Sequence, residues 1–318
     1  MMILICGEAL IDMVPMTVSD GRPEVFSPCP GGSPYNTAVA AGRLGAPVSF
    51  LSRLSKDFFG EILVKRLVQN KVGIDMVARS EQNTTLAFVK LEPGKEPRYI
   101  FYTAGAADRS FSQDDLPAVL PAEIDCVVFG SIAMTMEPAA STIEALILRE
   151  RNRVISFDPN IRPVMIHDKD AYIKRYEKWA AASTIVKISG ADIDFIYPGL
   201  DLEGAARKIL EMGPRIVVCT LGTGGATALL RRDSGSPVRA DAPIVDLPVV
   251  DTIGAGDTFH GALLSYLELR GKMSASALAS LTQGELHDAL YFANKAASLV
   301  CSRQGAEPPY LAEVEALS

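Results

Sequence analysis

The sequence predicts an α/β protein with a doubly wound, mostly parallel sheet and a small β lid. Three observations lead to this prediction. Short apolar runs rich in β-branched residues alternate with longer segments of helical spacing. The short runs are continuously apolar, as expected for parallel strands that helices cover on both faces. Two segments, 10–26 and 84–104, break the alternation and are assigned to the lid.

Composition favours a single large domain. The chain has 318 residues, of which 48% are hydrophobic and 22% charged, typical of a globular protein with a large core. It shows no internal repeat, low-complexity tract or long linker. We therefore expect one domain over residues 1–318, with the lid as an appendage.

Charge and cysteine usage limit the possible partners and location. The net charge of -7 and the lack of a basic stripe argue against nucleic-acid and membrane-surface roles. The apolar start lacks a basic flank and a cleavage site, and no run reaches the length of a membrane span. Five scattered cysteines without CxxC pairs indicate reduced thiols. These features predict a cytoplasmic protein.

The expected strands follow in chain order as short apolar runs. They lie at 2–6, 48–54, 126–132, 154–158, 184–189 and 215–221. Segments 57–72 and 201–213 show helical spacing between such runs and supply crossovers.

The lid segment 84–104 alternates with period two on each side of the turn-rich "EPGKEP". This pattern predicts an antiparallel hairpin with one solvated face. A plain extension of a sheet, without functional meaning, fits the same pattern.

The stretch "DTIGAGDTF" at 251–259 carries the strongest chemical signal. Apolar residues at helical spacing begin at Phe259, so the glycines open a helix. Such a helix start presents free N–H groups and the positive end of the dipole, which suit a phosphate. The alternative is a tight turn at Gly254 and Gly256 with Asp257 as a helix cap, and the residues alone leave both interpretations open.

Other nucleotide and nucleophile motifs are missing from the sequence. There is no GxxxxGK[ST], no GxGxxG and no GxSxG. The three histidines are not spaced like metal ligands. This disfavours a standard P-loop enzyme, a dinucleotide oxidoreductase and an α/β-hydrolase.

Two segments together resemble the signatures of a known family. "PGGSPYNTAVAAGRLGA" at 30–46 and "DTIGAGD" at 251–257 are similar to those of the PfkB (ribokinase-like) carbohydrate kinases. Within that family, "GEALIDMVP", "RYIFYTAGAADRSF", "SFDPNIRP" and "VKISGADIDF" resemble bacterial fructokinases. The resemblance covers nearly the whole chain and implies a ribokinase-like fold, which agrees with the strand pattern.

The resemblance implies ATP-dependent phosphorylation of the 6-hydroxyl of D-fructose, with Mg²⁺. It makes Asp257 the general base, while the backbone amides of Gly254, Ala255 and Gly256 hold the transferring phosphate. Potassium activation, known in the family, would involve backbone oxygens near Asp251 and the "RQGAEPP" segment. Pro309 stands there in place of a frequent Ser, which leaves monovalent-cation dependence open.

The resemblance also assigns residues to the two substrates. The expected sugar contacts are Asp12, Gly31, Gly32, Asn36, Asn160, Arg162 and Glu137. The expected nucleotide contacts are Lys187, Thr220, Gly222, Gly225 and Asn294. Without the family, Asn36 is a helix cap, Gly31 and Gly32 form a turn, Arg162 is a surface charge, and 219–226 is a strand with a hairpin turn.

Asp192 departs from the family pattern. It occupies the place of a Glu that acts on Mg²⁺ through water, and its shorter side chain reaches less far. A kinase for another sugar, such as 2-keto-3-deoxygluconate or ribose, remains an alternative, as does a sugar-binding regulator without activity. We also expect a homodimer formed through the lid, because exposed apolar strands need a cover.

Overall fold

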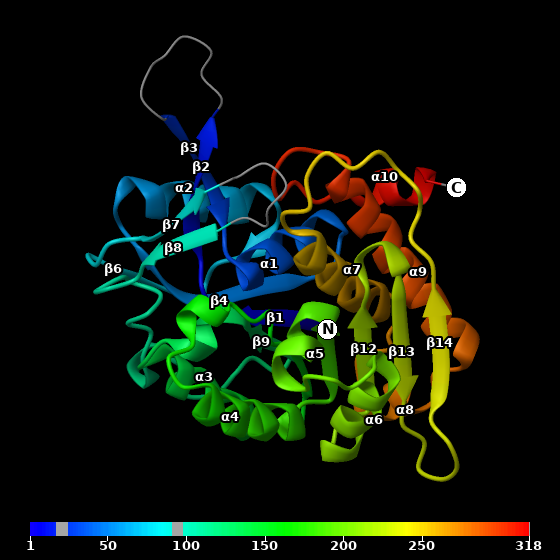
Figure 1. Cartoon of the computed structure of the whole chain (residues 1–318). Coiled ribbons are helices and arrows are strands. Elements are labelled where there is room, and N and C mark those ends of the chain that lie inside the picture. The colour runs from blue at the N-terminus through cyan, green and yellow to red at the C-terminus, as the bar shows by residue number, and fades with distance from the viewer. Residues whose placement is uncertain (17–24, 91–97, 318) are drawn as a thin grey trace.

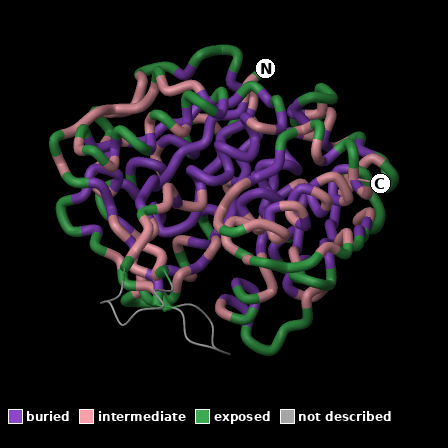
Figure 2. The backbone as a smooth tube through the Cα atoms, turned by 90° about the horizontal axis from the view of Figure 1, so that it is seen from above, coloured by how far each residue is buried: buried purple, intermediate pink, exposed green. Residues whose placement is uncertain are grey.

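A computed structural model describes residues 1–16, 25–90 and 98–317 (Figure 1). A large sheet lies between two layers of helices, and a smaller sheet stands away from it at one end. Figure 2 shows the buried backbone concentrated along the middle of the molecule, with exposed segments around the rim. None of the described helices combines the length and apolarity that crossing a bilayer requires.

The large sheet has ten strands in the order β14-β13-β12-β11-β10-β9-β1-β4-β5, with β6 also pairing with β4. Neighbours from β12 through β11, β10, β9, β1 and β4 are parallel, and β13 and β14 add an antiparallel edge. The predicted mostly parallel sheet is therefore confirmed. The strands are β1 (Met2–Cys6), β4 (Val48–Ser55), β5 (Val72–Gly73), β6 (Val77–Ser80), β9 (Ile124–Gly130), β10 (Val154–Asp158), β11 (Ile185–Ser189), β12 (Ile216–Thr220), β13 (Ala226–Leu230) and β14 (Val238–Ala242).

Alternation along the buried strands divides the core into two halves. In β1, Ile3 and Ile5 face one cluster, while Leu4 and Cys6 face the other. Helices α1, α2, α7, α8, α9 and α10 contribute to the first cluster, and α3, α4, α5 and α6 contribute to the second. The helices are α1 (Ser33–Arg43), α2 (Phe58–Gln69), α3 (Ala139–Arg149), α4 (Lys169–Ala182), α5 (Gly190–Ile196), α6 (Leu202–Met212), α7 (Ala255–Leu269), α8 (Ala275–Ala279), α9 (Gln283–Cys301) and α10 (Leu311–Ala316).

The two segments that break the α/β alternation join in one small sheet of order β3-β2-β7-β8. Its strands are β2 (Leu10–Met16), β3 (Val25–Gly31), β7 (Thr85–Lys90) and β8 (Arg98–Tyr102). The predicted antiparallel hairpin is present as β7 and β8. The turn between β7 and β8, residues 91–97, and the connection between β2 and β3, residues 17–24, lie outside the described residues.

The small sheet has two different faces. One carries the buried Ala87 and Val89 and, paired with Ala87, Asp12. The other carries Ile100 and Tyr102, which are 62% and 61% exposed. The solvated face is thus apolar near its edge strand, and the face with Asp12 turns toward the rest of the protein.

The strand order gives the large sheet a topological switch point. The chain runs from β1 to β4 on one side and returns to β9 on the other, so the connections diverge between β1 and β9. Open α/β sheets bind ligands at the carboxyl ends of the strands at such a point. Glu8 follows β1, Asp158 ends β10 and Ser189 ends β11, so all three lie at this edge.

Candidate active site

The N-terminus of α7 forms the floor of the site. Gly254 is its N-cap in the left-handed region, with φ 76°, and no side chain caps the helix. A Cβ on Gly254 would lie 2.8 Å from Ala306 Cβ, so both backbone shape and space require glycine. The Ala255 amide reaches Thr252 O at 3.3 Å, and the next amides start the helix without intrahelical acceptors.

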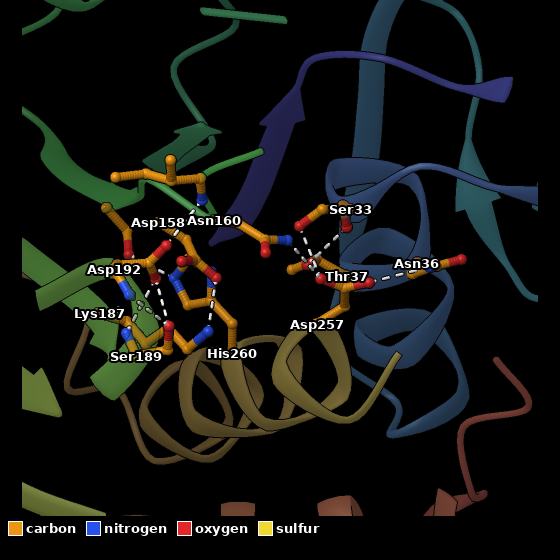
Figure 3. Close-up of polar contacts among 12 residues, drawn as sticks. Ser33, Asn36, Thr37, Asp158, Asn160, Lys187, Ser189, Asp192, Asp257 and His260 are labelled. Carbon is orange, nitrogen blue, oxygen red and sulfur yellow. Dashed lines mark hydrogen bonds and ion pairs between the residues drawn. The ribbon is translucent and has the colours of Figure 1, made fainter. Parts of the chain in front are cut away.

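Asp257 in the first turn of α7 faces another helix instead of capping its own. Its Oδ1 accepts a hydrogen bond from Ser33 Oγ at 2.6 Å, and its Oδ2 accepts one from Asn36 Nδ2 at 2.9 Å (Figure 3). Asn36 lies inside α1, whose N-cap is Gly32, so Asn36 is not a cap either. The two cap interpretations are thus wrong for Asp257 and Asn36.

Burial sets the protonation of Asp257. The side chain is nearly inaccessible, and desolvation raises its pKa above the ordinary range, while the hydrogen bonds from Ser33 and Asn36 oppose that shift. A carboxylate with raised basicity at the start of a helix is suited to take a proton from a bound hydroxyl.

A third donor reaches Asp257 from the loop after β10. Asn160 Nδ2 lies 3.3 Å from Asp257 Oδ1, and Arg162 Nη1 donates to Asn160 Oδ1 at 2.6 Å. Asn160 has a positive φ of 36°, which is uncommon for a residue other than glycine. Arg162 therefore orients the amide that contacts the carboxylate and is more than a plain surface charge.

Asp12 from β2 belongs to the same electrostatic group. Burial raises its pKa to about 7, the Arg162 charge lowers it and the Asp257 charge raises it. A Cβ on Gly31 would lie 2.1 Å from Asp12 Oδ2, and one on Gly32, where φ is 104°, would lie 2.8 Å from Glu8 O. The two glycines leave room for the carboxylate and for the chain after β1.

Glu8 is a site residue that sequence reasoning missed. Its carboxylate is fully buried and accepts from Ser33 N at 3.2 Å and from Ala133 N at 3.1 Å. Burial raises its pKa to about 7. An acid directly after an apolar strand was the available signal for Glu8, whereas Ser33 looked like an ordinary helix-start residue.

A buried ion pair lies on the other side of Asp257. Lys187 Nζ of β11 is 2.8 Å from Asp158 Oδ2 of β10, and both side chains are at most 5% exposed. A Cβ on Gly256 would lie 3.1 Å from Lys187 Nζ, so the ammonium sits against the first turn of α7. Asp158 was not singled out in the sequence, although it stands in the quoted "SFDPNIRP".

His260 of α7 packs beside this pair. Its Nε2 shares a 2.7 Å hydrogen bond with Ser156 Oγ, and its Nδ1 is 3.9 Å from Asp158 Oδ2. Burial lowers its pKa to about 3, so the imidazole is neutral at neutral pH.

The two acids considered for cations are engaged by the protein. Asp192 Oδ1 accepts from Ile161 N at 2.7 Å, and its Oδ2 accepts from Ser189 Oγ at 2.6 Å in the capping box of α5. Asp251 accepts from Ile253 N at 3.0 Å and from Gly305 N at 2.9 Å, which ties two loops together. Among the described residues, no three His, Cys, Asp or Glu side chains gather as a metal site.

Two predicted contacts lie apart from the Asp257 cluster. Glu137 accepts from Arg175 at 2.8 Å and from Ser141 N at 3.1 Å, which occupies both carboxylate oxygens. Asn294 donates to Ala242 O at 2.9 Å and to Pro243 O at 3.0 Å, so only its carbonyl remains for a nucleotide.

The segment 219–226 forms a hairpin turn. Thr220 ends β12, and β13 begins at Ala226 and pairs antiparallel with it. Gly222 and Gly225 have φ 55° and 81°, and a Cβ on Gly225 would lie 2.3 Å from Ala242 O. The turn geometry requires these glycines whether or not a nucleotide binds there.

A buried carboxylate beside an uncapped helix start, at the carboxyl ends of the strands of a doubly wound sheet, fits a phosphotransferase that acts on a hydroxyl group. Residues 1–312 match the description "pfkB family carbohydrate kinase". The chain belongs to this family.

Proteins similar over nearly the whole length of this chain agree with the family assignment. A fructokinase of Rhizobium leguminosarum bv. trifolii is 39% identical over 90% of this chain and 86% of its own. The fructokinase of Xylella fastidiosa with bound ATP superposes with a TM-score of 0.89 at 28% identity, covering 99% and 97% of the chains. The Vibrio cholerae O395 fructokinase bound to fructose, ADP and calcium superposes with a TM-score of 0.83 at 26% identity, covering 99% of this chain and 98% of its own.

Proposed function

We propose that this carbohydrate kinase transfers the γ-phosphoryl group of ATP to the 6-hydroxyl of D-fructose. The observation that carries the proposal is Asp257, a buried carboxylate held by Ser33 and Asn36 at the open start of α7. The fructokinase relatives support the choice of fructose, and the ATP- and ADP-bound fructokinase structures support ATP as the donor.

In the proposed reaction, Asp257 accepts the proton of the attacking hydroxyl. The amides of Gly254, Ala255 and Gly256 stabilise the phosphoryl group as it moves, and such positioned donors supply much of the barrier reduction in phosphoryl transfer. Lys187 adds a fixed positive charge beside Gly256. A general base of this kind contributes about 10²- to 10⁴-fold.

The sugar would lie under the small sheet, which we propose acts as a lid on one domain formed by residues 1–318. Asp12, Asn36, Asn160 and Arg162 offer acceptors and donors for its hydroxyls, and Gly31 and Gly32 allow close approach. The shared electrostatic environment of Asp12, Arg162 and Asp257 supports this grouping. Thr220, Gly222 and Gly225 are proposed on the nucleotide side.

A divalent cation, which we propose is Mg²⁺, would neutralise phosphate charge when bound with the nucleotide. The engaged carboxylate of Asp192 fits a role in shaping the loop through Ile161 and Ser189 better than direct metal ligation. The loop that Asp251 ties to Gly305 offers backbone oxygens for potassium, and omitting potassium from the assay tests that role. Because ATP is the donor, we propose a cytoplasmic location.

The test is ADP release measured with fructose, glucose, mannose, ribose and 2-keto-3-deoxygluconate. We expect fructose to give the highest kcat/KM, and Asp257→Ala to lower kcat at least about a hundredfold with unchanged folding. Asp170→Ala, an exposed acid in the first turn of α4, is the matched control. Preference for another sugar would contradict the fructose assignment, and absence of turnover with any sugar would indicate a non-catalytic regulator.

We also propose a homodimer that covers the apolar face of the small sheet. Phe26, Phe88 and Tyr102 form a row with ring centroids 5.3 and 5.6 Å apart, and Ile100 lies beside them in register with Phe88. Exposed apolar sheet faces of this kind favour association.

A further inference from the structure

A lysine in β11 and the aspartate that ends the adjacent β10 form a buried pair beside the start of α7 (Figure 3). We propose that Asp158 is a positioning residue for phosphoryl transfer, which acts by holding the Lys187 ammonium against the first turn of α7. This inference rests on the proposed function, because it gives Lys187 the transferring phosphoryl group as its partner.

The position of Lys187 is defined by two neighbours. Asp158 Oδ2 accepts its hydrogen bond at 2.8 Å, and the missing side chain of Gly256 opens the space next to its Nζ. An ammonium at that point adds a full charge to the partial positive charge of the helix start, within reach of the same anion.

The charge of Lys187 depends on its surroundings. Burial alone would lower its pKa, but the charge and hydrogen bond of Asp158, with smaller contributions from Asp192 and Asp257, together raise the pKa of Lys187 above its ordinary value. Another titratable neighbour is His260, which is neutral at neutral pH and bonded to Ser156. Asp158 is therefore the main counter-charge for Lys187, and removing it leaves a buried cation poorly compensated.

Asp158 also has an oxygen that the fold does not use. Its Oδ1 is buried and has no hydrogen-bond partner among the described residues. Buried polar atoms without partners are uncommon in folded proteins, and a group that binds there only during the reaction would account for this one. A hydrophobic pair would fill this space without that cost, so stability alone does not account for the pair.

The first experiment compares pH profiles of kcat/KM for ATP in the wild type, Asp158→Asn and Asp158→Glu. We expect Asp158→Asn to lose activity at alkaline pH, because Lys187 deprotonates more readily, so the basic limb moves at least one pH unit lower. Asp158→Glu keeps the charge and should restore the basic limb. A folded Asp158→Asn enzyme with the wild-type profile and wild-type KM for ATP would overturn the inference.

The second experiment uses Lys187→Met and the double variant Lys187→Met/Asp158→Asn, in which both buried charges are replaced. Losing one preorganised donor to the phosphoryl group should lower kcat about 10²- to 10³-fold in Lys187→Met. The double variant should match Lys187→Met within about twofold, because Asp158 acts only through Lys187.

A double variant at least tenfold less active than Lys187→Met would show that Asp158 acts independently of Lys187 and would refute the proposal. Kinase activity of the wild type is measured in the same assay. If wild-type kinase activity is absent with every sugar, the proposed function fails. If wild-type activity is present but the double variant is at least tenfold less active than Lys187→Met, only the positioning role of Asp158 fails.

Discussion

The Ser33 hydroxyl donates a 2.6 Å hydrogen bond to Asp257 Oδ1 across 224 positions of the chain. It joins the first turn of α1 to the first turn of α7. The two helices approach closely further along, where a Cβ on Gly261 would lie 2.7 Å from Thr37 O. The carboxylate on one helix is thereby oriented by the other, and this contact defines the geometry of the proposed base.

Removing the Ser33 hydroxyl should make Asp257 harder to ionise. In Ser33→Ala the carboxylate loses a donor that favours its charged form, so its pKa rises further and the acidic limb of the pH–kcat profile moves to higher pH. We expect kcat at pH 7 to fall about tenfold. Steady-state rates between pH 5 and 9 measure the shift, with the exposed Ser276→Ala in α8 as control. An unmoved acidic limb would contradict the assigned role.

Asp12 should lower stability at neutral and alkaline pH. Its pKa in the fold, about 7, exceeds the ordinary 3.8, so the folded protein favours the protonated carboxyl. Its contribution to stability is therefore most favourable below about pH 4 and is lost as pH rises to about 7. Asp12→Asn should melt at a higher temperature than the wild type at pH 8, and the difference should shrink toward pH 4.

The same Asp12→Asn variant should bind sugar less well. Asn replaces an acceptor-only carboxylate with an amide, so we expect KM for fructose to rise at least about tenfold, which corresponds to the loss of a charge-assisted hydrogen bond. Thermal melts at four pH values and fructose titrations separate the two effects. If Asp12→Asn melts at the wild-type temperature at pH 8, burial of the Asp12 carboxylate does not destabilise the fold.

Gly254→Ala should destabilise the start of α7. The left-handed backbone with φ 76° costs about 1–2 kcal/mol for an alanine, and the new Cβ would also press on Ala306. Gly284→Ala in α9 is the matched control, because its Cβ would meet only Thr282 Oγ1 at 4.0 Å. In urea denaturation, Gly254→Ala should show a lower free energy of unfolding than the wild type. Gly284→Ala should show an unchanged or higher one. Equal urea midpoints for Gly254→Ala and the wild type would show that an alanine is not strained at position 254.

The proposed dimer should separate when its apolar face is charged. Ile100→Glu adds a carboxylate to the exposed row with Phe88 and Tyr102, and burying it would cost several kcal/mol. Sedimentation at micromolar concentration should show a monomer for this variant and a dimer for the wild type. Val119→Glu, at a site 80% exposed elsewhere, should remain dimeric. A wild-type monomer would reject the dimer.

Much of the fold could be predicted because its signals are local. Continuous apolar runs correspond to β1, β4, β9, β10, β11 and β12, and the helical spacing at 57–72 and 201–213 corresponds to α2 and α6. The start of α7 was also predictable, since glycines followed by apolar residues at helical spacing lie together in the chain.

The composition of the site was less predictable. Ser33 and Asp158 carry no sequence signal that separates them from other polar residues near element ends, and the only signal for Glu8 is its place directly after an apolar strand. Their contacts arise when β1, α1 and β10 bring their ends to one edge of the sheet. Glu137 and Asn294 show the opposite case. The sequence analysis assigned them to the sugar and the nucleotide, but in the fold their polar groups bond to nearby protein partners.

The sequence by itself determined the alternating layers, the glycine-rich start of a helix and the family to which the chain is similar. Apolar periodicity and glycine placement act over a few residues and can be read along the chain. Only the tertiary structure decided which donors surround Asp257 and which carboxylate neutralises Lys187. Hydrogen-bond partners and burial depend on the packing of elements far apart in sequence, and that packing decides which of several similar polar side chains faces the site.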